Sequence, residues 1–298
     1  MILLFCIIAA FILIIVYSLI ENRYIKTVEY TLHFDKQSRM RMVTKTECAE
    51  QMVPGVHTHI VQLSDLHNCR YGERNRRLVE KVKACRPDVI LITGDMINKY
   101  KPVRDELYDL FEQLGKLCPC IYSLGNHELK EREKYPERFS EYIHKVQSCG
   151  IIISDNEQHR IMINNTVFQF ASYSSDLQQY KKQFSKKRTD YNAKEIPDAD
   201  TNGITILLSH DPELTRQYVK TAYSIIFSGH LHGGIVRVPG WRGIISTRFV
   251  LFPKYDGGCY RLDESHVLVV SRGLGSHTVK FRLFNRPELV HTIIVSEQ

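Results

Sequence analysis

Short apolar runs and amphipathic stretches alternate along most of this chain. Runs rich in branched apolar residues predict buried β-strands at 59–63, 87–92, 120–124, 151–154, 167–171, 204–208 and 224–227. Apolar residues at helical spacing predict helices over 75–85, 106–117 and 136–149. Strands that alternate with helices are typical of an α/β fold built around parallel strands.

Five further segments lie outside this alternation. Residues 28–34 alternate apolar and polar side chains and predict a strand, whereas the polar segment 36–52 predicts a connecting strand or loop. Residues 267–271 and 289–295 are rich in β-formers, and we expect them to pair in a second sheet. Residues 174–203 are polar and rich in lysine, so we expect a helical or loop excursion beside the functional site.

The first twenty residues form a separate apolar segment. Residues 2–20 carry no charge, and a helix of that length at about 1.5 Å per residue spans the roughly 30 Å hydrocarbon core of a bilayer. A cleaved signal peptide is the alternative, but no basic residue precedes the run and residues 17–20 offer a poor cleavage site. We therefore expect an uncleaved single-pass anchor over residues 1–22.

The flanking charges and the cysteines both favour a cytoplasmic body on a cell-membrane anchor. Arg23 and Lys26 follow the anchor and nothing basic precedes it, which the positive-inside rule associates with a cytoplasmic location. An odd number of cysteines without regular spacing is more typical of reduced thiols than of a disulfide framework. Outside the anchor these are Cys48, Cys69, Cys85, Cys118, Cys120, Cys149 and Cys259.

The composition and the charge of the chain narrow the classes of partner that it could bind. At 298 residues and 43% hydrophobic, it can bury a large core. The net charge of +7 is spread along the sequence with no nucleic-acid-binding motif, so we expect no nucleic acid partner. The densest basic run, at 181–188, fits either a solvated surface segment or a site for an anionic substrate or lipid headgroup.

Polar motifs follow five of the predicted strands. The carboxyl ends of parallel strands meet at one edge of a sheet, so these motifs are expected to converge although they are far apart in sequence. They are Ser64-Asp65-Leu66-His67, Gly94-Asp95, Gly125-Asn126-His127-Glu128, Ser209-His210 and Gly229-His230-Leu231-His232.

The motifs together supply seven oxygen or nitrogen ligands, enough for two divalent metal ions. Carboxylate and imidazole bind Mn, Fe or Zn, and ligand type alone does not choose among them. Two adjacent metal ions are suited to cleaving phosphate esters, with a water or hydroxide held by both ions as the nucleophile. A carboxylate bridges two ions better than a neutral imidazole does, which makes Asp95 the candidate bridge.

The five motifs resemble the signature of the calcineurin-like metallophosphoesterases in their residues and in their order along the chain, over residues 57 to 235. The resemblance implies an α/β (α+β), four-layer fold in which a two-sheet β-sandwich is flanked by helices. It places the catalytic domain at 57–298, after a linker and first strand at 23–56. It also implies a phosphate-ester substrate cleaved at a phosphodiester or pyrophosphate bond.

The resemblance also implies a role for each motif residue. One metal ion would be held by Asp65, His67, Asp95 and His232, and the other by Asp95, Asn126, His210 and His230. His127 would contact the phosphate and protonate or stabilise the leaving oxygen, and Glu128 would orient His127.

Four stretches resemble membrane-anchored bacterial members of that family: Ser64-Asp65-Leu66-His67-Asn68, Ser209-His210-Asp211-Pro212, Gly229-His230-Leu231-His232-Gly233-Gly234 and Ser271-Arg272-Gly273-Leu274-Gly275. Some of those members are assigned as UDP-2,3-diacylglucosamine pyrophosphatases. An anchor beside a catalytic domain suits such a lipid-linked substrate, and equally another envelope or phospholipid ester. Arg70 and Arg272 could hold a diphosphate or pair with surface acids, and Gly233 and Gly234 could approach phosphate or only turn the chain. Ile235 stands where that branch commonly has Gln, which puts substrate detail in doubt.

Two alternatives to this function remain at the level of sequence. A protein phosphatase is opposed by the anchor and by the lack of the longer arginine-bearing patterns after Asp95 and Glu128. A metal-binding scaffold without turnover is opposed by the presence of both His127 and Asp95, because inactive chains usually lose one of them. The sequence predicts no oligomeric state.

Overall fold

Two large β-sheets pack face to face in the computed structural model, which describes residues 1–34, 40–43, 55–175, 177–180, 196–200, 202–239, 241–246, 250–276 and 281–297. The first sheet has seven strands in the order β2-β1-β15-β3-β4-β5-β6. Its strands are β1 (Lys26–Phe34), β2 (Met40–Val43), β3 (Val56–Leu63), β4 (Val89–Ile92), β5 (Cys120–Ser123), β6 (Ile152–Ser154) and β15 (Glu288–Ser296).

The second sheet has six strands in the order β13-β14-β10-β9-β8-β7. Its strands are β7 (Gln158–Ile163), β8 (Thr166–Tyr173), β9 (Ile204–Ser209), β10 (Ile225–Ser228), β13 (Gly258–Arg261) and β14 (Val267–Val270). A separate two-stranded hairpin is formed by β11 (Val236–Arg237) and β12 (Gly243–Ile245). The two-sheet sandwich predicted from the motifs is confirmed.

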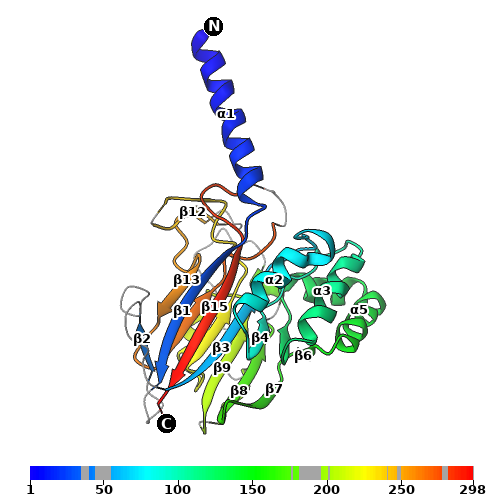
Figure 1. Cartoon of the computed structure of the whole chain (residues 1–298), viewed down its shortest axis with the longest axis vertical. Coiled ribbons are helices and arrows are strands. Elements are labelled where there is room, and N and C mark those ends of the chain that lie inside the picture. The colour runs from blue at the N-terminus through cyan, green and yellow to red at the C-terminus, as the bar shows by residue number, and fades with distance from the viewer. Residues whose placement is uncertain are drawn as a thin grey trace.

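Helices cover the outer face of the first sheet (Figure 1). The helices of the body are α2 (Arg76–Ala84), α3 (Asp105–Gly115), α4 (Asn126–Lys134), α5 (Pro136–Ser148) and the short α6 (Thr215–Tyr218), with 3-10 turns η1 (Glu73–Asn75) and η2 (Leu177–Tyr180). The three helices predicted from apolar periodicity correspond to α2, α3 and α5, to within two residues at each end.

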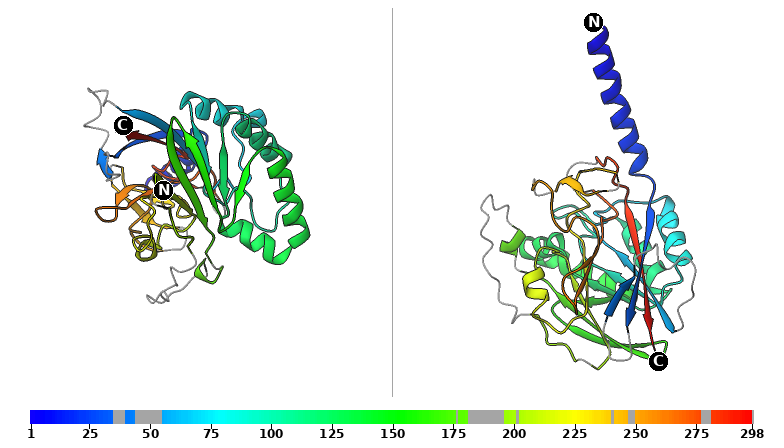
Figure 2. Two further views of the ribbon diagram at one scale, coloured as in Figure 1. Left: turned by 90° about the horizontal axis from the view of Figure 1, so that it is seen from below. Right: turned by 90° about the vertical axis from the view of Figure 1, so that its left-hand side faces the viewer.

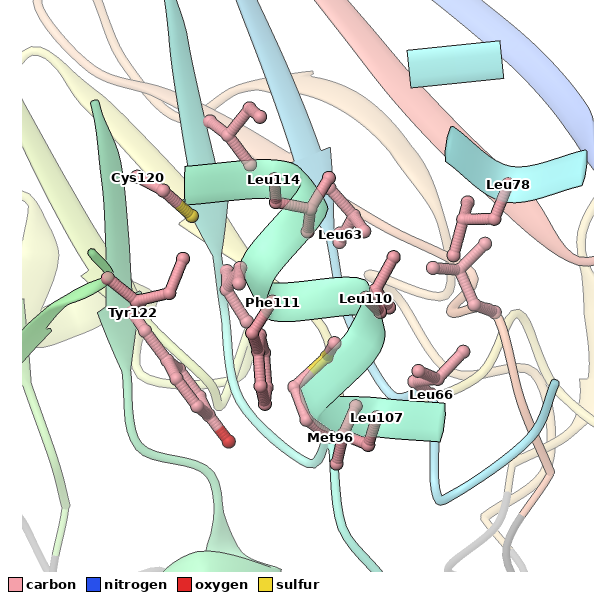
Figure 3. Close-up of a cluster of buried hydrophobic side chains, with 14 of the residues drawn as sticks. Leu63, Leu66, Leu78, Met96, Leu107, Leu110, Phe111, Leu114, Cys120 and Tyr122 are labelled. Atoms are coloured by element: carbon pink, nitrogen blue, oxygen red, sulfur yellow. The ribbon is translucent and has the colours of Figure 1, made fainter. Parts of the chain in front are cut away.

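Side chains that alternate along the strands divide the core into layers. In β4, Val89 and Leu91 pack between the two sheets, and Ile90 and Ile92 face the helices. On the helical side, α3 contributes apolar residues spaced i, i+3, i+4 and i+7, and Figure 3 shows them against Leu63, Cys120 and Tyr122 of the sheet. These α3 residues are Leu107, Leu110, Phe111 and Leu114.

Strand β15 corrects one prediction about the second sheet. Residues 267–271 do join that sheet as β14, but 289–295 belong to β15, which lies in the first sheet between β1 and β3. β15 is parallel to β1 and antiparallel to β3, so its neighbours are more than two hundred residues away in sequence. A strand buried on both faces gives no local signal of which sheet it joins.

Helix α1 (Ile2–Glu21) stands away from the body in Figure 1 and in the right-hand view of Figure 2. It is long and apolar enough to cross a membrane, and only Ser18 and Glu21 of its residues are buried. The chain leaves α1 through β1, which runs away from it. β3 runs in the opposite direction to β1 through its antiparallel pairing with β15, so the carboxyl end of β3 points back toward α1.

Candidate metal centre

All five polar motifs lie at the carboxyl ends of strands, as predicted. Strands β3, β4 and β5 of the first sheet lead to Asp65, Asp95 and Asn126. Strands β9 and β10 of the second sheet lead to His210 and His230. The two groups of strands are parallel within their sheets, so the sandwich brings ligands from both sheets to one end of the molecule.

Five of the seven predicted ligands have a backbone in the left-handed region. A positive φ costs a non-glycine residue about 1–3 kcal/mol and persists only where the surroundings enforce it. Such conformations gather at functional sites, and here they aim successive side chains inward from tight loops. The residues are Asp65 (φ 54°), His67 (φ 51°), Asp95 (φ 55°), His230 (φ 75°) and His232 (φ 52°).

The ligand atoms form two groups that meet at the carboxylates. In one group, His67 Nε2 lies 3.1 Å from His232 Nε2, which in turn lies 3.3 Å from Asp65 Oδ1. In the other, His210 Nε2 lies 3.2 Å from both Asp95 Oδ2 and His230 Nδ1. His67 Nε2 is 3.9 Å from Asp95 Oδ2, so Asp95 lies between the groups.

Backbone carbonyls fix the orientation of three imidazole rings. Nδ1 of His67, His210 and His232 faces the carbonyl oxygens of Ile97 (3.3 Å), Thr93 (2.6 Å) and Gly275 (3.1 Å). A carbonyl oxygen can only accept, so each Nδ1 donates its proton, and each Nε2 presents a lone pair to the centre when its ring is neutral. Burial lowers the pKa of His210, but the charge of Asp95 outweighs it and raises that pKa to about 10, so a bound cation would replace the proton on His210 Nε2. Burial, followed by the charge of Arg282, lowers the pKa of His232 to about 3, which keeps this ring neutral.

Several observations show that these residues fit divalent metal ions. Three groups of side chains, Asp65–His67–His232, His67–Asp95–His127 and Asp95–His210–His230, each bring their ligand atoms within 4.8 Å of one another. The amide oxygen of Asn126 is buried and has no hydrogen-bond partner among the described residues, as expected for an oxygen that awaits a cation. Imidazole, carboxylate and amide oxygen are ordinary ligands of Mn, Fe and Zn.

Glu128 is bound to backbone groups of two loops. That Glu128 orients His127 stays a prediction, and both of its carboxylate oxygens accept from backbone N–H groups of the loop after β4 and of Gly125. The hydroxyl of Tyr122 also donates to it, at 2.7 Å. Burial, followed by the charge of Asp95, raises the pKa of Glu128 to about 7. Glu128 therefore holds the backbone that carries Asp95.

His127 is oriented by the backbone of Lys99. The Lys99 N–H donates to His127 Nδ1 at 2.9 Å, so the neutral ring carries its proton on Nε2. Nε2 lies 3.9 Å from Asp95 Oδ2 and thus beside the metal groups. The His127 N–H donates to Asp95 Oδ1 at 2.8 Å, which ties the two motifs together.

Glycines in the motifs allow the loops to approach closely. A Cβ at Gly125 would collide with the carboxylate and backbone nitrogen of Asp95, and one at Gly229 would collide with the side chains of Ser64 and Asp65. Any side chain at either position would displace a predicted ligand.

The four predicted substrate-binding residues lie in different surroundings. Arg70 is exposed and lies 3.3 Å from Glu106, whereas Arg272 lies 3.3 Å from the buried Glu288. Gly233 and Gly234 have φ of 71° and 80°, and a Cβ at Gly233 would collide with Asn285. These glycines turn the chain directly after His232.

Two residues beside the centre carry no motif that could have revealed them. Tyr180 of η2 is buried, and its ring centroid lies 5.1 Å from that of His230. It belongs to the segment 174–203, for which we predicted a helical or loop excursion. The basic run at 181–188 of that segment lies outside the described residues. The buried guanidinium of Arg282 donates to the carbonyl oxygens of Arg272, Gly273 and Gly275. Because Gly275 O also accepts from His232, Arg282 supports a metal-site loop from behind.

A cavity of about 640 Å³ adjoins the centre. It extends from His67 to Asn22, the residue that follows α1, and basic side chains of Arg70, Lys101 and Arg104 line it. Six of the seven cysteines outside the anchor lie in the described part of the chain, and these six are free thiols as predicted, whereas Cys48 lies outside the described residues.

Comparisons with known proteins agree with this geometry. The profile of the calcineurin-like phosphoesterases matches residues 58–234. An uncharacterized metallophosphoesterase of Aquifex aeolicus is 24% identical over 283 residues, covering 92% of this chain and 93% of the relative. The UDP-2,3-diacylglucosamine pyrophosphatase LpxG of Chlamydia trachomatis is 27% identical over 293 residues, covering 78% and 83%.

Two further proteins are similar to this chain. A transmembrane protein with a metallophosphoesterase domain from Danio rerio is 25% identical over 244 residues, covering 79% of this chain and 52% of the relative. The crystal structure of the calcineurin-like phosphoesterase YfkN from Bacillus subtilis superposes with a TM-score of 0.45 at 13% identity, covering 74% of this chain and 83% of that one.

Proposed function

This chain belongs to the calcineurin-like phosphoesterase family, and from that premise we propose that it is a membrane-anchored phosphohydrolase with two divalent metal ions. The family consists of metal-dependent hydrolases of phosphoric esters. The bond that we propose it cleaves is a phosphodiester or a pyrophosphate.

One observation carries the proposal of two ions. The two ligand groups meet at Asp95, and the oxygen of Asn126 is buried without a hydrogen-bond partner among the described residues. We infer that Asp65, His67, Asp95 and His232 hold one ion, and that Asp95, Asn126, His210 and His230 hold the other. Such ions would lower the pKa of a bound water to about 7 and offset the charge of the phosphate.

The remaining residues position groups and move a proton. The Nε2 proton of His127 is held in place by the Lys99 N–H on the opposite nitrogen, and it is available for the leaving oxygen. Glu128 fixes the loop of Asp95 through three backbone N–H groups, which limits the movement of the carboxylate shared by the two groups.

For the substrate we propose a lipid-linked phosphate ester such as UDP-2,3-diacylglucosamine. The cavity beside His67 reaches Asn22 at the end of α1, so a substrate in it could extend from the centre toward the membrane. The side chains of Arg70, Lys101 and Arg104 would complement a second anionic group. Two LpxG relatives are named for that substrate.

The metal assignment is tested with the full-length chain in detergent, loaded with Mn²⁺ and assayed on bis(p-nitrophenyl) phosphate. We expect Asn126→Ala and His210→Ala to lose measurable turnover, because each removes a proposed ligand. His144→Ala, an exposed histidine on α5, serves as the matched control and should keep wild-type activity. Full activity in either ligand variant would disprove the assignment.

The substrate proposal needs a second assay with the same preparation. Rapid hydrolysis of UDP-2,3-diacylglucosamine, with little activity on the generic diester, is the expected result. Hydrolysis of the generic diester alone would retain the metallophosphoesterase and reject this lipid substrate.

We also propose that the body lies on the cytoplasmic side, since Arg23 and Lys26 directly follow the anchor. A cysteine introduced at the exposed Glu141 of α5 should then resist an impermeant maleimide in intact cells and react after lysis. Labelling in intact cells would place the body outside.

A further inference from the structure

An apolar surface lies at the end of the body from which α1 emerges. In the described part of the chain beyond α1, eleven large apolar side chains are exposed, and six of them belong to two neighbouring segments, the described residues of 236–252 (236–239, 241–246 and 250–252) and 281–287. Both segments lie near the foot of α1 in Figure 1 and Figure 2. The six residues, here called the hairpin surface, are Val238, Trp241, Val250, Leu251, Phe252 and Phe284, with exposed fractions between 36% and 63%.

Direct contacts join this surface to the last turn of α1. The ring centroid of Phe284 lies 5.4 Å from that of Tyr17, and the Arg282 N–H donates to Ser18 Oγ at 2.9 Å. Tyr17 lies inside the uncharged run that we expect to cross the bilayer. Because a helix of about 20 residues only just spans the hydrocarbon core, Phe284 lies at the depth where α1 leaves it.

Backbone pairing extends this contact to the hairpin. Val236 bridges to Leu283, and the Arg237 N–H donates to Leu283 O at 3.0 Å. Farther along, Ile245 bridges to Leu251, and the Trp241 and Phe252 rings lie 5.7 Å apart. The hairpin surface is thus attached through consecutive hydrogen-bonded segments to the foot of α1.

A buried arginine fixes the hairpin with its apolar side chains outward. Arg237 donates to Asp256 at 2.9 Å, to Gly233 O at 2.8 Å and to Trp241 O at 3.1 Å. These contacts hold the turn that carries Trp241 next to the residue that follows His232. Exposing this much apolar surface to water is unfavourable, by about 25 cal/mol per Å², and contributes nothing to the core.

We propose that the hairpin surface inserts into the interfacial layer of the membrane that α1 crosses, so that the body docks on the lipid beside its anchor. The inference rests on the proposed anchor. Tryptophan and phenylalanine beside arginine are typical of this layer. Arg242 lies over the Trp241 ring at 5.2 Å, and Arg286 is half exposed beside the foot of α1, so both can reach anionic headgroups. Because the hairpin surface is continuous with the foot of α1, we favour lipid, and not a second copy of the chain, as the partner that covers it.

Trp241 is the only tryptophan in the chain, which makes it a direct reporter. The full-length protein is reconstituted into phosphatidylcholine–phosphatidylglycerol vesicles with and without bromine on the upper part of the acyl chains. We expect brominated lipid to quench Trp241 fluorescence by about twofold or more, since bromine quenches only on contact and interfacial tryptophan reaches that depth. Emission that aqueous iodide quenches and brominated lipid does not would overturn the proposal.

Substitutions in the hairpin surface, together with flotation of the protein with the vesicles, distinguish lipid insertion from a dimer interface and from failure of the anchor. Leu251→Glu and Phe284→Glu should each reduce the bromine quenching, while Met162→Glu, which changes an exposed apolar residue of β7, should leave it unchanged. Protection from both quenchers, together with a dimer in crosslinking, would assign the surface to a second copy and reject the lipid. A chain that fails to float with the vesicles overturns the anchor and this inference together, whereas a floating chain with unquenched Trp241 overturns this inference alone.

Discussion

His127 is the residue whose contribution can be separated from metal binding. Its Nε2 proton is directed by the Lys99 N–H on Nδ1, and it is expected to reach the leaving oxygen. Replacing it with alanine should lower kcat by about 10²–10⁴-fold on an alkyl phosphodiester, the usual contribution of a general acid. The loss should be much smaller on bis(p-nitrophenyl) phosphate, because p-nitrophenolate leaves without a proton.

The comparison of the two substrates is itself the measurement. Steady-state kinetics of His127→Ala on both esters, with bound metal quantified in each preparation, distinguishes proton transfer from loss of metal. An equal loss on both substrates at full metal content would show that His127 supplies no proton to the leaving group.

Cys118 provides a test of local electrostatics. Burial, and after it the charge of Asp88, raises the pKa of the Cys118 thiol to about 12. Only the thiolate reacts, so alkylation by iodoacetamide at about pH 8 should be at least about 100-fold slower in the native protein than in urea. The native rate should rise about tenfold per pH unit below that pKa. Mass spectrometry of the peptide that contains Cys118 measures both, and rapid native labelling at neutral pH would contradict the burial.

The residues that could be predicted from sequence are those with a chemical motif. Asp95 and His210 follow apolar strands and match a known order of motifs, so their convergence was predictable. Arg282 and Tyr180 act through tertiary contacts with carbonyls and rings from distant loops, which no local pattern records. The position of Glu128 shows the same limit, because its partners are backbone groups of another motif.

Among the elements, apolar patterning was reliable where both faces of a strand are buried. Strands β4 and β14 consist entirely of buried residues and appear in the sequence as continuous apolar runs. Helix α4 was missed because its sequence is mostly charged and only Leu129 joins the main core cluster, so it lacks helical apolar periodicity. The sheet assignment of β15 failed because its partners are remote in sequence.

Helix α3 offers a prediction about packing at the level of an element. Leu110 is fully buried against the first sheet, in the cluster of Figure 3. Leu110→Ala should lower the free energy of unfolding by about 2–5 kcal/mol, since it leaves a cavity that the surrounding strands cannot close. Urea unfolding followed by circular dichroism measures the change. Lys116→Ala, an exposed change at the end of the same helix, is the control, and equal stability of the two variants would contradict the packing.

At the scale of the whole molecule, the metal centre joins the two sheets. Asp65, Asp95 and Asn126 come from one sheet, and His210 and His230 come from the other, so bound ions would clamp the open end of the sandwich. Any ligand that binds only the folded state stabilises it, by about 2.7 kcal/mol at a hundredfold excess over Kd.

Removal of metal should therefore lower the melting temperature. We expect EDTA to reduce the Tm of the full-length chain in detergent, and excess Mn²⁺ to restore it, by differential scanning fluorimetry. His210→Ala should show little response to either treatment, whereas His144→Ala should respond as the wild type does. A Tm that EDTA leaves unchanged in a metal-loaded sample would show that the ions do not couple the sheets.

The place of β15 also determines when the molecule can fold during synthesis. In the membrane-anchored protein that we propose, α1 is synthesised before every strand and reaches the membrane while the ribosome is still translating the body. When every other strand has been made, β1 and β3 still have a gap between them that only β15 can fill, and the first sheet has two unpaired edges. In that anchored protein the nascent chain is tethered before the first sheet is complete, and its catalytic end is supported on both sides only after residues 288–296 have left the ribosome.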